Sequence, residues 1–213
     1  MKTMTAFRNA IDKAPIVPVL TVHEADHAEP LAEALIRGGL TSVEITLRTP
    51  VALEVIRRMG LVGDELLVGA GTIISEGDVD ASLKAGADFL VTPGAGPMLL
   101  EALSSYDGVI LPGISTASEA MARFDEGYGV MKFFPAEAAG GAKFLKALSG
   151  PLPHMDFMPT GGITPENAVD YLALPNVVAI GGSWIASTEE MANGDWDAIA
   201  EKAAAAVKLG RRS

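Results

Sequence analysis

The sequence contains no cysteine. This absence excludes disulfide bonds, thiolate catalysis and metal sites with cysteine ligands. Basic residues are also scarce: 16 Lys and Arg stand against 27 Asp and Glu, which gives a net charge of −11 at pH 7. Nucleic acids and anionic membrane surfaces are bound by clustered Lys and Arg, so neither is an expected partner. A small anionic substrate is not excluded, because a local basic pocket can lie inside an acidic protein.

Long hydrophobic runs are missing as well. No apolar run approaches the roughly 18 residues of a membrane-spanning helix, and residues 1–9 lack the apolar core of a signal peptide. We therefore expect a cytoplasmic protein. The chain of 213 residues is 49% hydrophobic, which is enough for a sizeable core. No linker or low-complexity tract divides it, and we interpret residues 1–213 as a single domain.

Short apolar runs alternate along the chain with amphipathic, helix-like segments. The eight runs are residues 16–22, 42–47, 66–73, 89–93, 109–115, 129–135, 156–163 and 177–184. The helices are expected near residues 5–13, 25–37, 50–61, 76–85, 97–103, 117–124, 142–148, 165–172 and 196–209. Near-continuous apolar strands, each followed by a helix, predict a parallel sheet covered by helices. Eight such units are the number in a closed (β/α)₈ TIM barrel, so this α/β fold with an N-terminal helix is our prediction. A doubly wound open sheet is the alternative.

Lys132 interrupts the apolar run 129–135. Burial of an ammonium group is costly unless the group is paired or loses its proton. Desolvation favours the neutral amine, and a neutral lysine amine is a nucleophile toward carbonyl carbon. Lys132 is therefore a candidate catalytic residue. The alternative is a lysine that pairs with an inward carboxylate for purely structural reasons.

A carboxylate, a hydroxyl and a guanidinium alternate with apolar residues in the second run. Because side chains alternate in a strand, Glu44, Thr46 and Arg48 share one face, while Val43 and Ile45 face the other way. A barrel strand has no solvated face, which argues against a surface salt bridge. An inward Glu44 together with Lys132 favours catalysis, since titratable groups held together in a barrel are typical of active sites.

Glycine pairs follow the last two runs: Gly161-Gly162 and Gly181-Gly182. Backbone amides of such loops after strands seven and eight form the recurrent phosphate site of the TIM barrel. Thr72 offers a hydroxyl at the end of the third run, directly after Gly69-Ala70-Gly71. His23 and His27 have no obvious third ligand, so we expect no metal site.

Five segments closely resemble the 2-keto-3-deoxy-6-phosphogluconate (KDPG) aldolases, a family that also covers 4-hydroxy-2-oxoglutarate aldolase activity. They are Val43-Glu44-Ile45-Thr46-Leu47-Arg48-Thr49, Gly69-Ala70-Gly71-Thr72, Met131-Lys132-Phe133-Phe134-Pro135-Ala136-Glu137, Thr160-Gly161-Gly162-Ile163 and Gly181-Gly182-Ser183-Trp184. The resemblance extends from about residue 15 to residue 184. It implies a class I aldolase on a (β/α)₈ barrel, usually a homotrimer, with no cofactor and no metal.

The resemblance also implies residue roles. Lys132 would form a Schiff base with the substrate, and Glu44 would be the general acid and base. The substrate-binding residues would be Arg48 and Thr72 at the pyruvate carboxylate, Phe134 and Pro93 along the pocket, and Thr160, Gly161, Gly162, Gly182 and Ser183 at the distal, phosphate-bearing end.

The expected reaction is the reversible cleavage of KDPG to pyruvate and D-glyceraldehyde 3-phosphate, with activity also on 4-hydroxy-2-oxoglutarate. One alternative is the 6-phosphogalactonate epimer of the substrate. A second is a phosphosugar isomerase or epimerase with Glu44 as base, which would form no imine. A third is a non-catalytic phosphosugar-binding barrel. The sequence leaves the physiological substrate and the preferred direction open.

Overall fold

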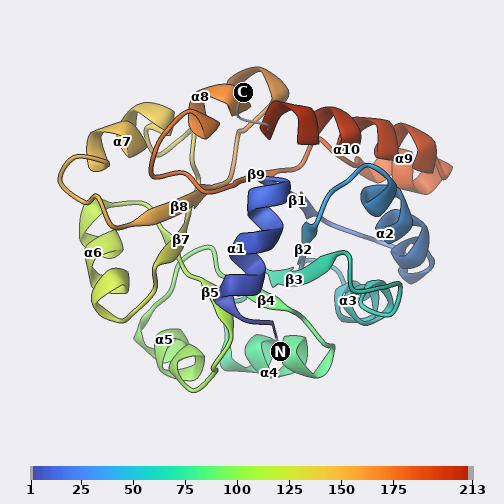
Figure 1. Cartoon of the computed structure of the whole chain (residues 1–213). Helices are drawn as coiled ribbons and strands as arrows, with labels where there is room; N and C mark the ends of the chain where they lie inside the picture. The colour runs from blue at the N-terminus through green and yellow to red at the C-terminus, as the bar shows by residue number, and fades with distance from the viewer. Residues whose placement is uncertain (1, 211–213) are drawn as a thin grey trace.

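The computed structural model describes residues 2–210, in which strands and helices alternate as expected (Figure 1). The strands are β1 (Ile16–Leu20), β2 (Ser42–Thr46), β3 (Leu67–Gly71), β4 (Phe89–Val91), β5 (Val109–Leu111), β6 (Gly113–Ile114), β7 (Val130–Phe133), β8 (Asp156–Pro159) and β9 (Ile180–Gly182). The helices are α1 (Met4–Lys13), α2 (Ala28–Arg37), α3 (Ala52–Met59), α4 (Glu76–Lys84), α5 (Pro97–Ser104), α6 (Ala117–Asp125), α7 (Gly141–Leu148), α8 (Pro165–Leu172), α9 (Thr188–Asn193) and α10 (Trp196–Gly210). A short 3₁₀ helix, Ala25–His27, precedes α2.

The strands form two parallel sheets in the described part of the chain. Six strands pair in the order β5-β4-β3-β2-β1-β9, and three pair in the order β6-β7-β8. β5 and β6 lie on either side of Pro112, so the stretch 109–114 pairs with β4 at its start and with β7 at its end. Proline has no amide hydrogen for a ladder, which accounts for the interruption. Two isolated bridges, Phe157 to Val177 and Thr160 to Gly181, connect the other edges.

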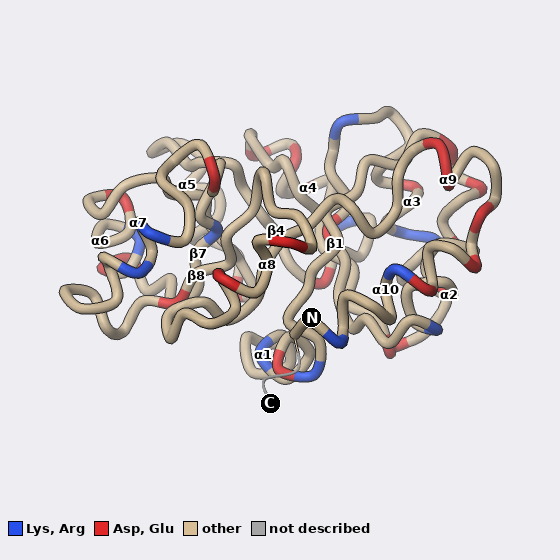
Figure 2. Tube along the Cα trace, turned by 90° about the horizontal axis from the view of Figure 1, so that it is seen from above, with Lys and Arg blue, Asp and Glu red and all other residues tan. Residues whose placement is uncertain are grey.

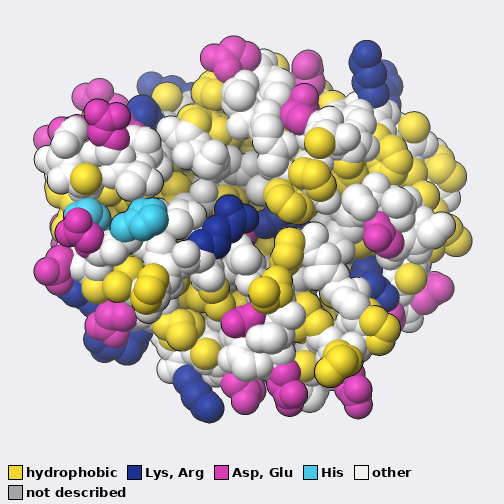
Figure 3. All heavy atoms as spheres, turned by 180° about the vertical axis from the view of Figure 1, so that it is seen from behind, with side chains coloured by type: hydrophobic (Ala, Val, Ile, Leu, Met, Phe, Trp, Pro, Cys, Tyr) yellow, Lys and Arg dark blue, Asp and Glu magenta, His cyan; other side chains and the backbone are white. Residues whose placement is uncertain are grey.

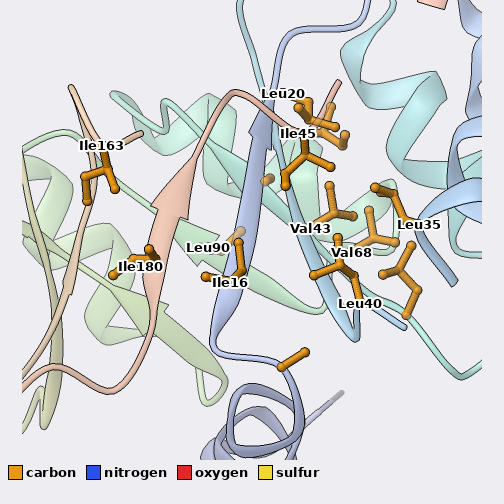
Figure 4. Close-up of a cluster of buried hydrophobic side chains, with 14 of the residues drawn as sticks. Ile16, Leu20, Leu35, Leu40, Val43, Ile45, Val68, Leu90, Ile163 and Ile180 are labelled. Atoms are coloured by element: carbon orange, nitrogen blue, oxygen red, sulfur yellow. The ribbon is translucent and has the colours of Figure 1, made fainter. Parts of the chain in front are cut away.

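The observed architecture is therefore an α/β fold with a curled parallel sheet, and helices surround it (Figure 1). Most strand residues are buried on both faces, as parallel sheets require. One face packs against the helices: Val43 and Ile45 of β2 lie with Leu35 of α2 in the larger apolar cluster (Figure 4). The prediction that Val43 and Ile45 face the helix layer is confirmed, and the opposite face of β2 carries Glu44 and Thr46.

The opening helix α1 covers one end of the curled sheet (Figures 1 and 2). Phe7 and Ile11 of α1 belong to the inner apolar cluster, together with strand residues such as Val17 and Phe89. The Arg8 guanidinium also donates a hydrogen bond of 2.7 Å to the Asp156 carboxylate at the start of β8. Helix α1 therefore covers the end of the curled sheet at which the strands start, opposite the end at which they finish (Figures 1 and 2).

Several element boundaries differ from those predicted. β4 ends at Val91 although the predicted run continues to Pro93. The Thr92 amide still donates a hydrogen bond of 3.2 Å to the Leu111 carbonyl, and Pro93 has no amide hydrogen with which to continue the ladder. The six-residue helix α9 was not expected. Its signal was present, since the Ser187 hydroxyl and the Glu190 carboxylate form a capping box at its start. No helix within residues 2–210 is both long and apolar enough to cross a membrane.

Candidate active site

Lys132 and Glu44 form a buried ion pair inside the curled sheet. Lys132 Nζ lies 2.9 Å from Glu44 Oε1 and 3.3 Å from Oε2, although the two residues are 88 positions apart in the sequence. Glu44 is fully buried and Lys132 is 5% exposed. Such a deeply buried ion pair is stable only while both members are present, because removal of one leaves an uncompensated buried charge.

Glycine makes the space that the Glu44 carboxylate occupies. β2 and β3 run in parallel, with Thr46 beside Gly71. A side chain at Gly71 would bring a Cβ atom within 2.0 Å of Glu44 Oε1. Gly69, two residues earlier, leaves equivalent space for the ring of Phe89. The glycine-rich end of the third run is therefore explained by close packing around the carboxylate.

Phe134 covers the other side of the amine. Its ring centroid lies 5.5 Å from Lys132 Nζ, within the range of a cation–π contact. The ring is half-buried and borders the cavity described next. The ring thus lies beside the amine, where an apolar wall was predicted, and its role in keeping the amine desolvated stays a prediction.

A cavity of about 310 Å³ opens above the ion pair at the carboxyl ends of the strands. On this face of the molecule, Lys and Arg side chains lie near the centre, beside hydrophobic ones (Figure 3). The lining residues are Val19, Leu20, Thr21, Thr46, Arg48, Lys132, Phe134, Thr160, Gly161, Gly162, Ile163, Gly181, Ser183, Ala186, Ser187 and Thr188. Seven of the predicted site residues are among them: Arg48, Lys132, Phe134, Thr160, Gly161, Gly162 and Ser183. The set combines a nucleophile, a cation and many hydrogen-bonding groups.

Arg48 and Thr72 lie together at one side of the site. Arg48 Nε donates a hydrogen bond of 3.2 Å to the Thr72 hydroxyl. Thr72 has φ of +62°, a left-handed conformation that a β-branched residue rarely adopts. Backbone strain of this kind concentrates at functional sites, where the surrounding structure maintains it. The exposed guanidinium is available to an anionic ligand, and its planar fork suits a carboxylate.

The two glycine pairs meet at the opposite side of the cavity. Gly161 and Gly162 both have positive φ, +103° and +77°, which glycine adopts without steric cost. The bridge between Thr160 and Gly181 brings β9 to this loop, and a Cβ atom at Gly181 would lie 2.2 Å from the Thr160 hydroxyl. That hydroxyl is buried and has no hydrogen-bond partner among the described residues. A buried unpaired hydroxyl beside a cavity is ready to bind a ligand.

Four predicted site residues do not line the cavity. Glu44 contacts the lining residue Lys132, and Thr72 contacts the lining residue Arg48. Gly182 is buried and leaves room for the Trp184 ring, while Pro93 is half-buried, with its backbone against Gly113. Substrate contact by Pro93 or Gly182 stays a prediction.

Sequence reasoning missed several polar residues of the site. One of them is Thr21, directly after β1, whose hydroxyl oxygen lies 2.8 Å from that of Thr46, the residue already expected on the face of Glu44. Thr21 is the polar residue within the first apolar run, residues 16–22, a signal that was available. Tyr171 of α8 donates a hydrogen bond to the Glu137 carboxylate beneath the Gly162 loop. No local pattern predicts that contact. Burial, together with the Glu137 carboxylate, raises the pKa of Tyr171.

The histidines contribute nothing to this site. His27 lies near Glu24, at 3.6 Å, and meets the Trp196 ring edge-on. Within residues 2–210, no three His, Asp or Glu side chains are grouped closely enough to hold a metal ion.

Known proteins match nearly the whole chain. The sequence model of the family described as KDPG and KHG aldolase matches residues 7–202. The chain is 45% identical to the 2-dehydro-3-deoxy-phosphogluconate aldolase of Pseudoalteromonas atlantica, over 94% of this chain and 93% of that protein. It is 43% identical to the KHG/KDPG aldolase of Escherichia coli K12, over 96% of each. The solved KDPG aldolase of Legionella pneumophila, with pyruvate captured as a covalent carbinolamine intermediate, matches with a TM-score of 0.90 and 42% identity, covering 94% of this chain and 97% of that one.

Proposed function

The chain belongs to the KDPG and KHG aldolase family, and we propose that it is a class I aldolase that cleaves KDPG reversibly to pyruvate and D-glyceraldehyde 3-phosphate. The observation that carries this proposal is the buried Lys132–Glu44 pair at the base of the cavity. A nucleophilic amine in contact with a carboxylate is what imine chemistry on a ketone requires.

The reaction begins with attack of the Lys132 amine on the C2 ketone. Glu44 first accepts a proton from the ammonium group, which frees the nitrogen lone pair. Attack forms a carbinolamine, Glu44 returns the proton to the departing hydroxyl, and water leaves. The product is a protonated imine between Lys132 and C2. This cation replaces the ammonium beside Glu44, so the buried carboxylate keeps a positive partner.

The protonated imine then draws electrons from the C3–C4 bond. Glu44 removes the proton of the C4 hydroxyl, the C3–C4 bond breaks, and glyceraldehyde 3-phosphate leaves as the aldehyde. The electron pair of the broken bond forms an enamine on Lys132. Protonation at C3 regenerates the imine, and addition of water releases pyruvate and the free amine. The lysine supplies the electrophilic catalysis, so no separate cofactor takes part.

The two sides of the cavity suit the two ends of this substrate. Arg48, held by Thr72, would bind the pyruvate carboxylate. The amides of Gly161 and Gly162, with the unpaired Thr160 hydroxyl and Ser183, would bind the phosphate end. The acidic net charge of the protein does not oppose the binding of this anionic substrate, because the cations of the cavity act locally.

A second substrate, 4-hydroxy-2-oxoglutarate, is proposed for the same residues. Its cleavage to pyruvate and glyoxylate uses the same C4 hydroxyl and needs no phosphate site. The E. coli relative named for both substrates favours this dual activity. The 6-phosphogalactonate epimer is the remaining alternative, and kcat/KM measured on the three substrates separates them.

We further propose that the two sheets close into one (β/α)₈ barrel that forms a single domain. The stretch 109–114 joins them at one edge, and the bridges from Phe157 and Thr160 join them at the other. A homotrimer is proposed from the family resemblance, and sedimentation velocity measures it. A cytoplasmic location stays a prediction.

The experiment that tests the proposed function is borohydride trapping. The protein is incubated with pyruvate, reduced, and mapped by peptide mass spectrometry, and a reduced pyruvyl adduct on Lys132 alone is expected. Lys132→Ala should give no adduct and no turnover. Because that change leaves Glu44 buried and unpaired, the double variant Lys132→Met with Glu44→Gln serves as a neutral control that keeps the core balanced. A folded wild-type protein without an adduct would leave only the isomerase and binding-barrel alternatives.

A further inference from the structure

Two threonine hydroxyls in the cavity have no part in the mechanism above. Thr21 follows the last residue of β1, and Thr46 is the last residue of β2. The strands pair with Leu20 beside Ile45, which brings the next residue of each, Thr21 and Thr46, side by side. Their hydroxyl oxygens lie 2.8 Å apart, and both residues line the cavity.

The direction of these hydrogen bonds follows from a third group. Thr46 Oγ1 also lies 3.1 Å from the carbonyl oxygen of Leu20, which can only accept a hydrogen bond. Each threonine has one hydroxyl hydrogen. Both contacts are therefore made together only if Thr46 donates to Leu20 and Thr21 donates to Thr46. The Thr21 oxygen is then left with free lone pairs and no hydrogen for a ligand.

The position of the threonine pair along the barrel indicates which part of the substrate the pair contacts. Thr46 is two residues beyond Glu44 on β2, which places it about 7 Å nearer the open end. On its other side, β1 pairs with β9, so Pro18 lies beside Gly182 and Thr21 lies toward the second glycine loop. The Thr21 oxygen is thus located between the Lys132–Glu44 pair and the phosphate end of the cavity.

We propose that Thr21 accepts a hydrogen bond from the substrate hydroxyl that lies between the cleaved bond and the phosphate, the C5 hydroxyl. This assignment rests on the proposed aldolase function. Thr46 is a positioning residue, since it accepts the hydrogen bond from the Thr21 hydroxyl and so directs the free lone pairs of the Thr21 oxygen into the cavity. The pair selects aldehydes that carry a hydroxyl beside the carbonyl carbon, because that hydroxyl becomes the C5 hydroxyl of the condensation product.

The test compares two aldehydes that differ only in this hydroxyl. Pyruvate is condensed with D-glyceraldehyde 3-phosphate and with 3-phosphooxypropanal, which lacks the 2-hydroxyl, and kcat/KM is measured for each. The wild type should prefer glyceraldehyde 3-phosphate by about five- to tenfold through this contact. Thr21→Val, which keeps the shape and removes the hydroxyl, should lose that preference by lowering kcat/KM for glyceraldehyde 3-phosphate alone.

Conservative variants separate recognition from a structural role. Thr21→Ser should retain the preference, and Thr46→Val should weaken it while Thr46→Ser restores it. Thr41→Val is the matched control, because the Thr41 hydroxyl also bonds a backbone carbonyl, that of Ala10, but lies outside the cavity. Its preference should equal that of the wild type.

Failure of the proposed role of Thr21 can be distinguished from failure of the proposed aldolase function. An active Thr21→Val enzyme with an unchanged preference, or with equal losses on both aldehydes, would overturn the role of Thr21 and leave the aldolase function intact. A folded wild type that condenses pyruvate with neither aldehyde and forms no borohydride adduct would overturn the aldolase function, and the role of Thr21 with it.

Discussion

At the scale of single residues, the site depends on a charge balance that persists through the reaction. The Glu44 carboxylate is fully buried, and the Lys132 ammonium is its hydrogen-bonded partner. The proposed imine also carries a positive charge at the same nitrogen. The carboxylate therefore faces a cation in the resting protein and in the covalent intermediate. The same contact gives the carboxylate a direct path for proton transfer.

Replacement of Glu44 by glutamine should separate binding from proton transfer. The amide of Glu44→Gln has nearly the same shape and still accepts a hydrogen bond from Lys132, but it cannot take up a proton at neutral pH. We expect kcat for KDPG cleavage to fall by about 10²–10⁴-fold, the usual size of a general acid–base contribution. Steady-state kinetics measure the loss, and pyruvate trapping should still label Lys132, more slowly.

The control for this change is Glu54→Gln, on the exposed Glu54 that pairs with Arg57 on α3. It should leave kcat unaltered. Wild-type turnover by Glu44→Gln would remove Glu44 from the mechanism.

At the scale of elements, the proposed phosphate loop is supported from behind. The segment after β7 contacts the loop after β8, because the Glu137 amide donates a hydrogen bond of 3.1 Å to the Gly161 carbonyl. Glu137 in turn accepts a hydrogen bond from Tyr171 of α8. A Cβ atom at Gly162 would lie 2.8 Å from Glu137 Cβ and Cγ. The loop can keep its amides toward the cavity only while position 162 has no side chain.

Gly162→Ala should impair the phosphate end selectively. The added Cβ meets Glu137 and also requires a positive φ, so the loop must shift. We expect KM for KDPG to rise about tenfold or more, while kcat/KM for 4-hydroxy-2-oxoglutarate, which has no phosphate, changes little. Gly86→Ala is the matched control: φ is +89° there, but no atom lies within 4 Å of the added Cβ. Equal losses on both substrates would contradict a phosphate role for this loop.

The ion pair that joins α9 to α10 predicts a pH effect on stability. The hydrogen bond from Lys202, with those from the Ser187 amide and hydroxyl, lowers the pKa of Glu190 from 4.5 to about 2. A carboxylate with a lowered folded-state pKa stabilises the protein above its unfolded pKa and loses that contribution as the pH falls. The Glu190 contribution should therefore disappear between about pH 4.5 and pH 2.

Glu190→Gln checks that prediction. Glutamine can still complete the capping box, so the variant loses the ion pair with Lys202. Its free energy of unfolding at pH 6 should be lower than that of the wild type by about 0.2–1 kcal/mol, the usual value of an exposed ion pair. The difference should shrink steadily as the pH falls below 4.5. Urea denaturation followed by circular dichroism measures it, with Glu189→Gln, at an exposed neighbouring position, as the control. A difference that stays constant down to pH 2 would refute the assignment.

At the scale of the whole molecule, stability and chemistry lie at opposite ends of the curled sheet. Helix α1 covers the end where the strands start, and Phe7 packs its ring against Phe89, with centroids 5.1 Å apart. The cavity lies at the end where the strands finish. This separation is the arrangement expected of the proposed TIM barrel, in which one end binds the substrate and the other stabilises the structure.

Phe7→Ala should therefore lower stability without changing catalysis. Phe7 is fully buried, and truncation of such a ring costs about 3–5 kcal/mol. We expect Tm to fall by roughly 10 °C, with kcat at 25 °C unchanged. Leu61→Ala, at a residue that is 75% exposed, is the control for the loss of an apolar side chain and should leave Tm nearly unchanged. A loss of kcat in folded Phe7→Ala would show that the two ends are coupled.

The sequence by itself determined what depends on local periodicity. Alternation along β2 was enough to predict Glu44 and Thr46 on one face and Val43 and Ile45 on the other, because successive strand side chains point to opposite sides. A lysine in an apolar run and glycine pairs after two strands were likewise visible without a structure. These signals also identified the family, and they predicted nearly the whole strand–helix order.

Only the tertiary structure decided which distant residues meet. The 2.9 Å contact between Lys132 and Glu44 joins strands 88 positions apart, and it exists because the sheet curls until β2 and β7 face each other. The space at Gly71, the positive φ of Thr72 and the Thr21–Thr46 contact depend on register between neighbouring strands. Register and curvature are set by packing of the entire core, so no local pattern contains them.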